Sequence, residues 1–291
     1  MVRFKAGLRD VWIVALYHLG RVRRTRVAYG QLAIFVLAST VSAYISYGLL
    51  ASVEGISARS SGMTPPDKPG AMYDSFVQSA EFVEMVPSHL GGSLISWATN
   101  VPYMPLTWFI GSMVLVPFLA VAMGWGAIAA DLSGRTLRFE AVRAGRFEIF
   151  VGRFFGMSFL LLLALSLGAL VPLYFSQFQM VDQAIHTQVA YFINFIPRVW
   201  VWALPFLAIG VTCSSIVSNS NSARALSIIL VMSSWWMYSL SNDLFGKLFP
   251  QEWVGGLYGG GFDWIVSGTS LLLISIMLLL PGVIVLRRRD I

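Results

Sequence analysis

The amino-acid sequence predicts an all-α integral membrane protein, and its composition and apolar stretches both support that fold class. Of the 291 residues, 57% are hydrophobic and 12% are charged, with a mean hydropathy of +0.72. A soluble domain carries about 25% charged residues, so this chain has too little charge to cover a water-soluble surface. Stretches such as FLLLLALSLGAL are apolar on every face and lack the alternation of a membrane β-barrel. A single cysteine, Cys213, excludes a disulfide framework.

Six stretches come near or meet the length of about 20 mostly apolar residues that a spanning helix needs. The expected spans are residues 27–50, 106–130, 154–175, 195–217, 225–240 and 264–286. Arg198 in the fourth span and Arg153 beside the third are expected to snorkel toward the membrane surface. None of these six ranges contains an aspartate or glutamate, which disfavours a proton- or sodium-coupled transporter.

The distribution of positive charge predicts the orientation of these spans. Six spans put both termini on one side, and sixteen of the twenty lysines and arginines lie on that side. The positive-inside rule therefore predicts cytoplasmic termini. The net charge of +6 follows from this topology, so it is not evidence for nucleic-acid binding.

Three polar or amphipathic segments flank the spans. Residues 1–26 predict an amphipathic helix in the cytoplasmic interface, with Trp12 and Ala15 on its apolar face, followed by a basic bend. It could be a simple anchoring tail or have a mechanical role. Residues 51–105 form a large external loop, with a second amphipathic helix expected at 71–86. Residues 241–263 mix aromatics with glycines and predict an external re-entrant segment, which is tolerated only where protein covers its backbone.

A charged island at 131–153 separates the second and third spans. It holds five arginines, a quarter of all the lysine and arginine in the chain. Ser133 is a candidate N-cap, and Thr136 to Arg146 predicts a short helix with Leu137 on its buried face. An ordinary positive-inside loop would explain the charge alone. Helical order with interleaved acids instead favours docking of a partner, because complementary charges fix register. The residues expected to contact that partner are Arg135, Arg138, Glu140, Arg143 and Arg146.

The order of motifs in this island resembles a known family. The island contains Asp131, Ser133-Gly134, Thr136-Leu137, Arg146 and Gly152-Arg153, and the chain ends in RRRDI. In these residues the chain resembles the permease subunit of ABC-2 type transporters, although it lacks that family's usual proline before the arginine. The resemblance implies six spans, an interfacial N-terminal helix and a cytoplasmic coupling helix between spans two and three, in the inner membrane of a prokaryote. It also implies a cytoplasmic ABC ATPase dimer and a second permease copy, identical or related, as partners.

Motifs for catalysis and cofactor binding are missing from the sequence. It contains no Gly-x4-Gly-Lys-Ser/Thr phosphate loop, and no histidine has a neighbour at metal-ligand spacing. We therefore expect no catalytic or metal site, and ATP and Mg²⁺ bound only by the separate ATPase. The chain would be the permease of an ATP-driven exporter. One alternative is a non-transporting anchor or scaffold of an envelope or motility complex. Another is an intramembrane enzyme, which would need an essential polar residue within a span, and none is evident.

Polar and aromatic residues in the first and fifth spans are the candidates for a translocation path. Ser42 and Tyr44 belong to the first span, and Trp235 and Trp236 to the fifth. The serines equally suit close helix packing, and the tryptophans equally suit an interfacial belt. If these residues line a path, its aromatic and apolar surface suits an amphiphilic cargo such as a lipid, peptide or drug-like molecule.

Overall fold

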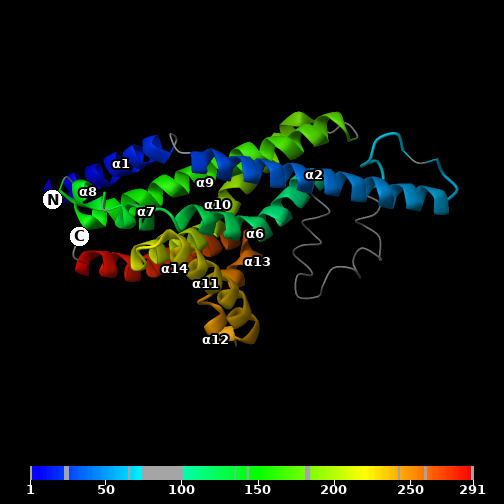
Figure 1. Cartoon of the computed structure of the whole chain (residues 1–291). Coiled ribbons are helices and arrows are strands. Elements are labelled where there is room, and N and C mark those ends of the chain that lie inside the picture. The colour runs from blue at the N-terminus through cyan, green and yellow to red at the C-terminus, as the bar shows by residue number, and fades with distance from the viewer. Residues whose placement is uncertain are drawn as a thin grey trace.

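The described part of the chain is an elongated bundle of helices with both ends of the chain at one end of the bundle (Figure 1). The computed structural model describes residues 2–22, 26–64, 66–73, 101–134, 136–142, 144–180, 184–241, 243–258 and 261–289. Every regular element within them is helical, which confirms the all-α class. The helix expected at 71–86 lies almost wholly outside these residues.

Five helices in the described residues are long and apolar enough to cross a membrane. They are α2 (Arg26–Ser60), α6 (Tyr103–Gly124), α9 (Arg146–Phe178), α10 (Ile185–Ile216) and α14 (Phe262–Arg288). The expected fifth span is helical as α11 (Ser220–Leu240) but is not among the five. Its first residues are SNSAR and four more serines follow, so its average hydropathy is too low for it to count among the apolar helices.

Helix α10 is the centre of the bundle, and 89% of its apolar 18-residue segment is buried. It packs against α6, α9, α11 and α14. The Trp202 indole donates to the Met113 carbonyl at 3.0 Å, and the Thr212 hydroxyl donates to the Leu278 carbonyl at 2.8 Å. These bonds satisfy polar groups that have no water to bind inside a membrane.

Helices α6 and α10 touch through two glycines. A Cβ at Gly210 would lie 2.9 Å from the Val121 carbonyl oxygen and 3.0 Å from the Gly124 Cα. Only a residue without a side chain permits this approach, which is the means by which small residues bring membrane helices together. The contact holds the end of α6 that leads into the charged island.

Helix α2 is longer than the expected span 27–50. It continues to Ser60 and is followed by Gly62, whose φ is 68°, with the Met63 amide donating to the Ala58 carbonyl at 2.8 Å. This is the hydrogen bond of a glycine C-cap. The extension contains a buried carboxylate, Glu54, which accepts from the amides of Gly70 and Met72 at 2.8 Å each. Glu54 therefore ties the loop after α2 back onto the helix.

The expected re-entrant segment 241–263 contains three short helices, α12 (Asp243–Gly246), η1 (Pro250–Trp253) and α13 (Val254–Tyr258). The Arg198 guanidinium donates to the Leu257 carbonyl at 2.7 Å and lies 5.7 Å from the Trp264 ring centre. Arg198 is 8% exposed, so the expectation that it snorkels is wrong. Its charge is used inside the protein, where it anchors α13 to α10. The position of this segment in a bilayer stays a prediction.

Helix α1 (Val2–Val22) runs alongside the first half of α9 (Figure 1). A Cβ at Gly152 would lie 2.8 Å from the Val11 carbonyl oxygen, and one at Gly156 would lie 3.3 Å from the Ala15 carbonyl oxygen. Ala15 is buried, as its place on the expected apolar face predicts. Trp12 was expected on the same face but is 62% exposed, because α9 covers only a narrow stripe of α1.

The glycine contact between α6 and α10 yields a stability prediction. Gly210→Ala should lower the free energy of unfolding by about 1–3 kcal/mol, because the new Cβ must push two backbones apart. The matched control is Gly48→Ala in α2, where nothing lies within 4 Å of the new Cβ; it should be neutral or slightly stabilising. Thermal unfolding in detergent measures both. Equal stability of the two variants would contradict the close contact.

Candidate functional site

The charged island folds into two short helices at the end of the bundle that holds both termini (Figure 1). Helix α7 (Ala129–Ser133) follows a turn after α6, and α8 (Leu137–Ala141) precedes α9. The Ser214 hydroxyl of α10 accepts from the amides of Ile128 and Ala129 at 2.7 and 2.8 Å. It thereby satisfies amides that the start of α7 leaves without helical partners.

Four charged side chains from α1, α7, α8 and α9 meet beneath α8, and we call them the ion-pair cluster. Arg21 donates to both carboxylate oxygens of Asp131, at 2.8 and 2.6 Å. Arg153 lies 2.7 Å from Asp131 and 2.5 Å from Glu140. Arg21 also reaches Glu140 at 3.5 Å. Two positive and two negative charges balance, so the cluster as a whole is neutral.

Burial explains why these charges must stay together. Arg153 is 1% exposed and Asp131 is 5% exposed. A buried charge is tolerated only when it is paired and hydrogen-bonded. Arg153 also donates to the Ala127 carbonyl, and the Thr136 hydroxyl donates to Asp131 at 2.7 Å. The planar guanidinium holds five N–H donors in a fixed fork that suits these partners, whereas a lysine ammonium has three donors around one atom.

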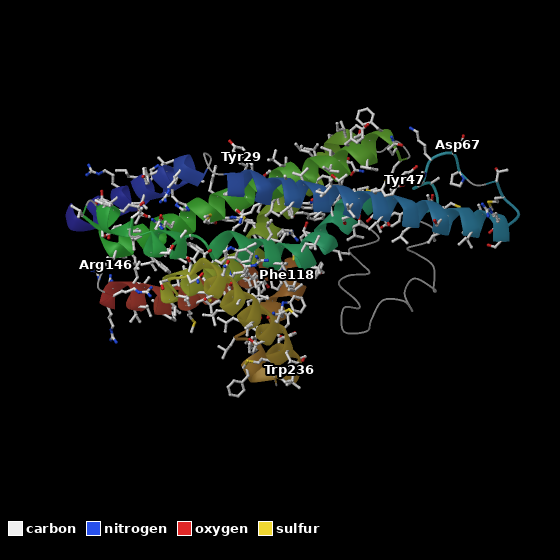
Figure 2. The ribbon with its side chains drawn as sticks, viewed as in Figure 1. Tyr29, Tyr47, Asp67, Phe118, Arg146 and Trp236 are labelled. Carbon is white, nitrogen blue, oxygen red and sulfur yellow. The ribbon has the colours of Figure 1, made fainter. Side chains whose placement is uncertain are left out.

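Arg146 makes a second connection, between the start of α9 and the end of α14. Its Nη1 donates to the carbonyls of Arg287 and Arg289 at 2.8 and 2.7 Å. Carbonyls at a helix C-terminus lack helical partners and carry partial negative charge. Figure 2 shows Arg146 at the same end of the bundle as the end of α14. This arginine therefore caps the last helix of the chain.

Helix α8 presents apolar side chains to solvent. Phe139 is 77% exposed and Val142, just after the helix, is 87% exposed. They line a groove of about 590 Å³ between α8 and α1, which we call the α1–α8 groove. Its other lining residues are Asp10, Ile13, Val14, Tyr17, Glu140 and Ala144. Two large apolar side chains this exposed beside a groove are typical of a contact surface for another molecule.

The five residues predicted to contact a partner have different positions. Glu140 and Arg146 turn inward, to the ion-pair cluster and to the end of α14. Arg135 and Arg143 lie outside the described residues, as does the side chain of Arg138. Contact of these five with a partner stays a prediction.

The candidate path residues do not converge within one chain. Ser42 faces α6, since a Cβ at Gly111 would lie 3.3 Å from its hydroxyl. Tyr44 and Trp236 are 67% and 69% exposed, and Trp235 is 40% exposed. Figure 2 shows Trp236 at the far end of α11, well away from α2.

Sequence reasoning did not predict that Arg21, Asp131 and Arg153 pair inside the bundle. Its expectations for Arg153 and Ser133 were also wrong. Arg153 was expected to snorkel but is buried, because Asp131 and Glu140 compensate its charge inside the bundle. Ser133 was expected to cap a helix, but its hydroxyl donates to the Ala130 carbonyl within α7. The one available signal was Arg153 itself, since it lies two turns into a helix that is otherwise apolar.

Leu137 is 1% exposed, as its predicted position on the buried face requires. The expected helix from Thr136 to Arg146 is shorter, because α8 ends at Ala141 and Arg146 already begins α9. Within the part of the chain that the structure describes, no group of three or more histidine, cysteine or acidic residues could hold a metal ion.

His18 is buried at the edge of the ion-pair cluster, where α1 contacts Gly156. Its Nε2 has no hydrogen-bond partner among the described residues. Burial, aided by the positive charge of Arg153, lowers the pKa of His18 to about 3. The imidazole is therefore neutral at physiological pH and adds no further positive charge beside Arg153.

His18 predicts a pH dependence of stability. Its folded pKa of about 3 lies below the unfolded value of 6.5, so its contribution is complete above pH 6.5 and is lost as the pH falls toward 3. Between about pH 7.5 and about pH 5.5 the protein should lose about 1.4 kcal/mol through this residue. His18→Leu should remove that part of the loss, whereas His186→Leu, at an exposed position, should keep it. Detergent unfolding at the two pH values measures the difference; an unchanged pH dependence in His18→Leu contradicts the assignment.

Comparison with known proteins identifies the family. No curated protein sequence matches the chain. The family model described as ABC-2 family transporter protein matches residues 12–254. This range covers most of the chain and includes α8, all of the ion-pair cluster and every lining residue of the α1–α8 groove except Asp10. The chain is a membrane transport permease that belongs to the ABC-2 transporter family.

Proposed function

We propose that the chain is the permease subunit of an ATP-driven exporter, and that a separate cytoplasmic ATPase docks on α8 and the α1–α8 groove. The observation that carries this proposal is the ion-pair cluster, which joins α8 to α1, α7 and α9. ABC-2 permeases generally partner with a cytoplasmic ATPase. In this role α8 is the coupling helix, α11 is the sixth span, and ATP and Mg²⁺ are bound by the partner.

The ion-pair cluster gives α8 a means of passing on a displacement. Glu140 on α8 pairs with Arg153 on α9 and with Arg21 on α1. Arg153 also pairs with Asp131, which Arg21 binds as well. Separating Glu140 leaves two arginines with one carboxylate, so a net positive charge remains around the buried Arg153, which costs free energy. A displacement of α8 is therefore expected to move α1 and α9 with it, because breaking the ion-pair cluster would cost more free energy. This is the physical basis of the proposed alternating access.

The exposed residues of α8 supply the contact with the ATPase. A few residues near the centre of an interface contribute most of its binding energy, and Phe139 and Val142 have the exposure that such a position requires in the unbound chain. Arg135, Arg138 and Arg143 keep their proposed role around this centre, where their charges would set register. Glu140 and Arg146 act from beneath by holding α8 and α9 in place.

The orientation of the proposed complex follows from charge. Sixteen of twenty lysines and arginines lie on the side of the termini and α8 in a six-span topology, which favours a cytoplasmic location for that side. The membrane would be the inner membrane of a prokaryote, and two permease copies would sit over an ATPase dimer. Because Ser42 and Tyr44 lie far from Trp235 and Trp236 within one chain, a path lined by both sets would require the second copy.

A scaffold without an active ATPase is the alternative function. It needs no force transmission, so it leaves the exposed apolar residues of α8 without an assigned partner. It predicts that no Walker-motif ATPase co-purifies with the chain from its native membranes.

Replacing the two exposed apolar residues of α8 tests the docking surface. Phe139→Ala/Val142→Ala should reduce the co-purified Walker-motif ATPase, and its cargo-dependent ATP hydrolysis, by about tenfold or more, because interface anchors each contribute about 1–2 kcal/mol. The double variant should keep its thermal stability, since neither side chain is buried. Mild-detergent purification of the tagged protein from native membranes, followed by an ATPase assay, measures both.

Met63→Ala is the matched control, because Met63 is 62% exposed and follows α2 at the other end of the bundle. It should retain the ATPase fully. Undiminished retention by the double variant would show that α8 is not the docking surface. Absence of any ATPase from the intact wild-type protein would instead favour the scaffold.

A further inference from the structure

Five arginines gather at the ends of α9, α11 and α14 nearest to the termini, and we call them the terminal arginine patch. They are Arg146, Arg224, Arg287, Arg288 and Arg289. Within the described residues, the ion pairs formed by arginines involve Arg9, Arg21 and Arg153 and none of these five. The patch therefore carries positive charge that the described carboxylates do not neutralise, unlike the ion-pair cluster.

Backbone and ring contacts hold the patch in position without cancelling its charge. Arg146 donates to the carbonyls of Arg287 and Arg289, and Arg289 donates to the Ser215 carbonyl at 2.9 Å. Arg287 lies 5.5 Å from the Phe147 ring centre. These contacts join the start of α9 and the ends of α10 and α14.

Arg224 lies 4.9 Å from the centre of the Trp125 ring, so it also rests on an aromatic face at the start of α11. Cation–π contacts of this kind attract the guanidinium but leave its charge in place. Both Arg224 and Arg287 are exposed, which leaves them open to an anionic ligand.

The patch adjoins an exposed apolar face of α14, a surface suited to contact with lipid on a spanning helix. Only 22% of the apolar 18-residue segment of α14 is buried. The exposed apolar residues of α14 include Leu272, Leu273, Ile276, Met277, Leu280 and Ile284. Arg287 and Arg288 follow this face directly and are exposed, so they stand where hydrocarbon gives way to headgroups. Figure 1 shows α14 and α1 on opposite sides of α9 at this end, so the patch is separate from the α1–α8 groove.

We propose that the terminal arginine patch binds the phosphate of an anionic lipid headgroup in the adjacent leaflet. Guanidinium groups pair with phosphate through charge-assisted hydrogen bonds, and clusters of arginine just beyond a spanning helix attract anionic lipids. Continuity with the lipid-facing surface of α14 favours a lipid over an acidic protein surface. The proposal requires only that the chain spans a membrane, and does not depend on the ATPase.

Lipid titration of the purified full-length protein, read by native mass spectrometry, tests this proposal. The probes are phosphatidylglycerol and phosphatidylcholine of equal chain length. The wild-type protein should bind phosphatidylglycerol about tenfold or more tightly than phosphatidylcholine. Arg287→Gln/Arg288→Gln should lose most of that preference, whereas Arg287→Lys/Arg288→Lys should keep it, because the charge is retained.

Arg59→Gln/Lys68→Gln is the matched control, since both side chains are exposed at the opposite end of the bundle, Arg59 in the last turn of α2 and Lys68 in the loop after it. This variant should keep the full preference for phosphatidylglycerol. If the arginine-to-glutamine pair fails to fold, the wild-type preference must still fall between about 0.05 M and about 0.5 M salt. Equal binding of the two lipids would overturn the proposal and assign the patch to an acidic protein partner. Displacement of phosphatidylglycerol by an equal concentration of inorganic phosphate would overturn it in favour of a free anion.

Discussion

The burial of Arg153 is the constraint around which one end of this bundle is arranged. A guanidinium that is 1% exposed inside an apolar helix needs two carboxylates and a backbone carbonyl to remain charged there. Asp131 and Glu140 supply the carboxylates, and Ala127 supplies the carbonyl. Meeting these needs determines the fold of the segment between α6 and α9, because all three partners lie in it. Arg21 then balances the second carboxylate and brings in the end of α1.

The remainder of the bundle supports this arrangement through close contacts that small residues allow. Gly152 and Gly156 let α1 approach α9, and Gly210 lets α6 approach α10. Ser214 then satisfies the amides at the start of α7. In an ABC-2 permease such rigidity suits the proposed role of α8, since a displacement applied there is distributed over helices instead of being absorbed by a loose loop.

Local sequence pattern could predict the helices but not the ion-pair cluster. Long apolar stretches predicted α6, α9, α10 and α14, and periodicity predicted the burial of Leu137. The motifs of the island pointed to the family. Arg153 was misjudged because its burial depends on partners that the chain supplies from elsewhere, with Arg21 110 residues away from Asp131. The exposure of Phe139 and Val142 was also unpredictable, since it follows from the burial of the charged residues around them.

The measurement that tests the central claim most directly is backbone hydrogen exchange of the protein in lipid nanodiscs, compared between wild type and Glu140→Gln. If the ion-pair cluster joins α8 to α1 and α9, removing one carboxylate should raise exchange by about tenfold or more in α8 and also in the last turn of α1, where Arg21 loses a partner. The control Glu148→Gln removes a carboxylate that forms no ion pair among the described residues, and should leave both segments unchanged. Faster exchange confined to α8, with α1 unaffected, would contradict the coupling of these helices through buried charge.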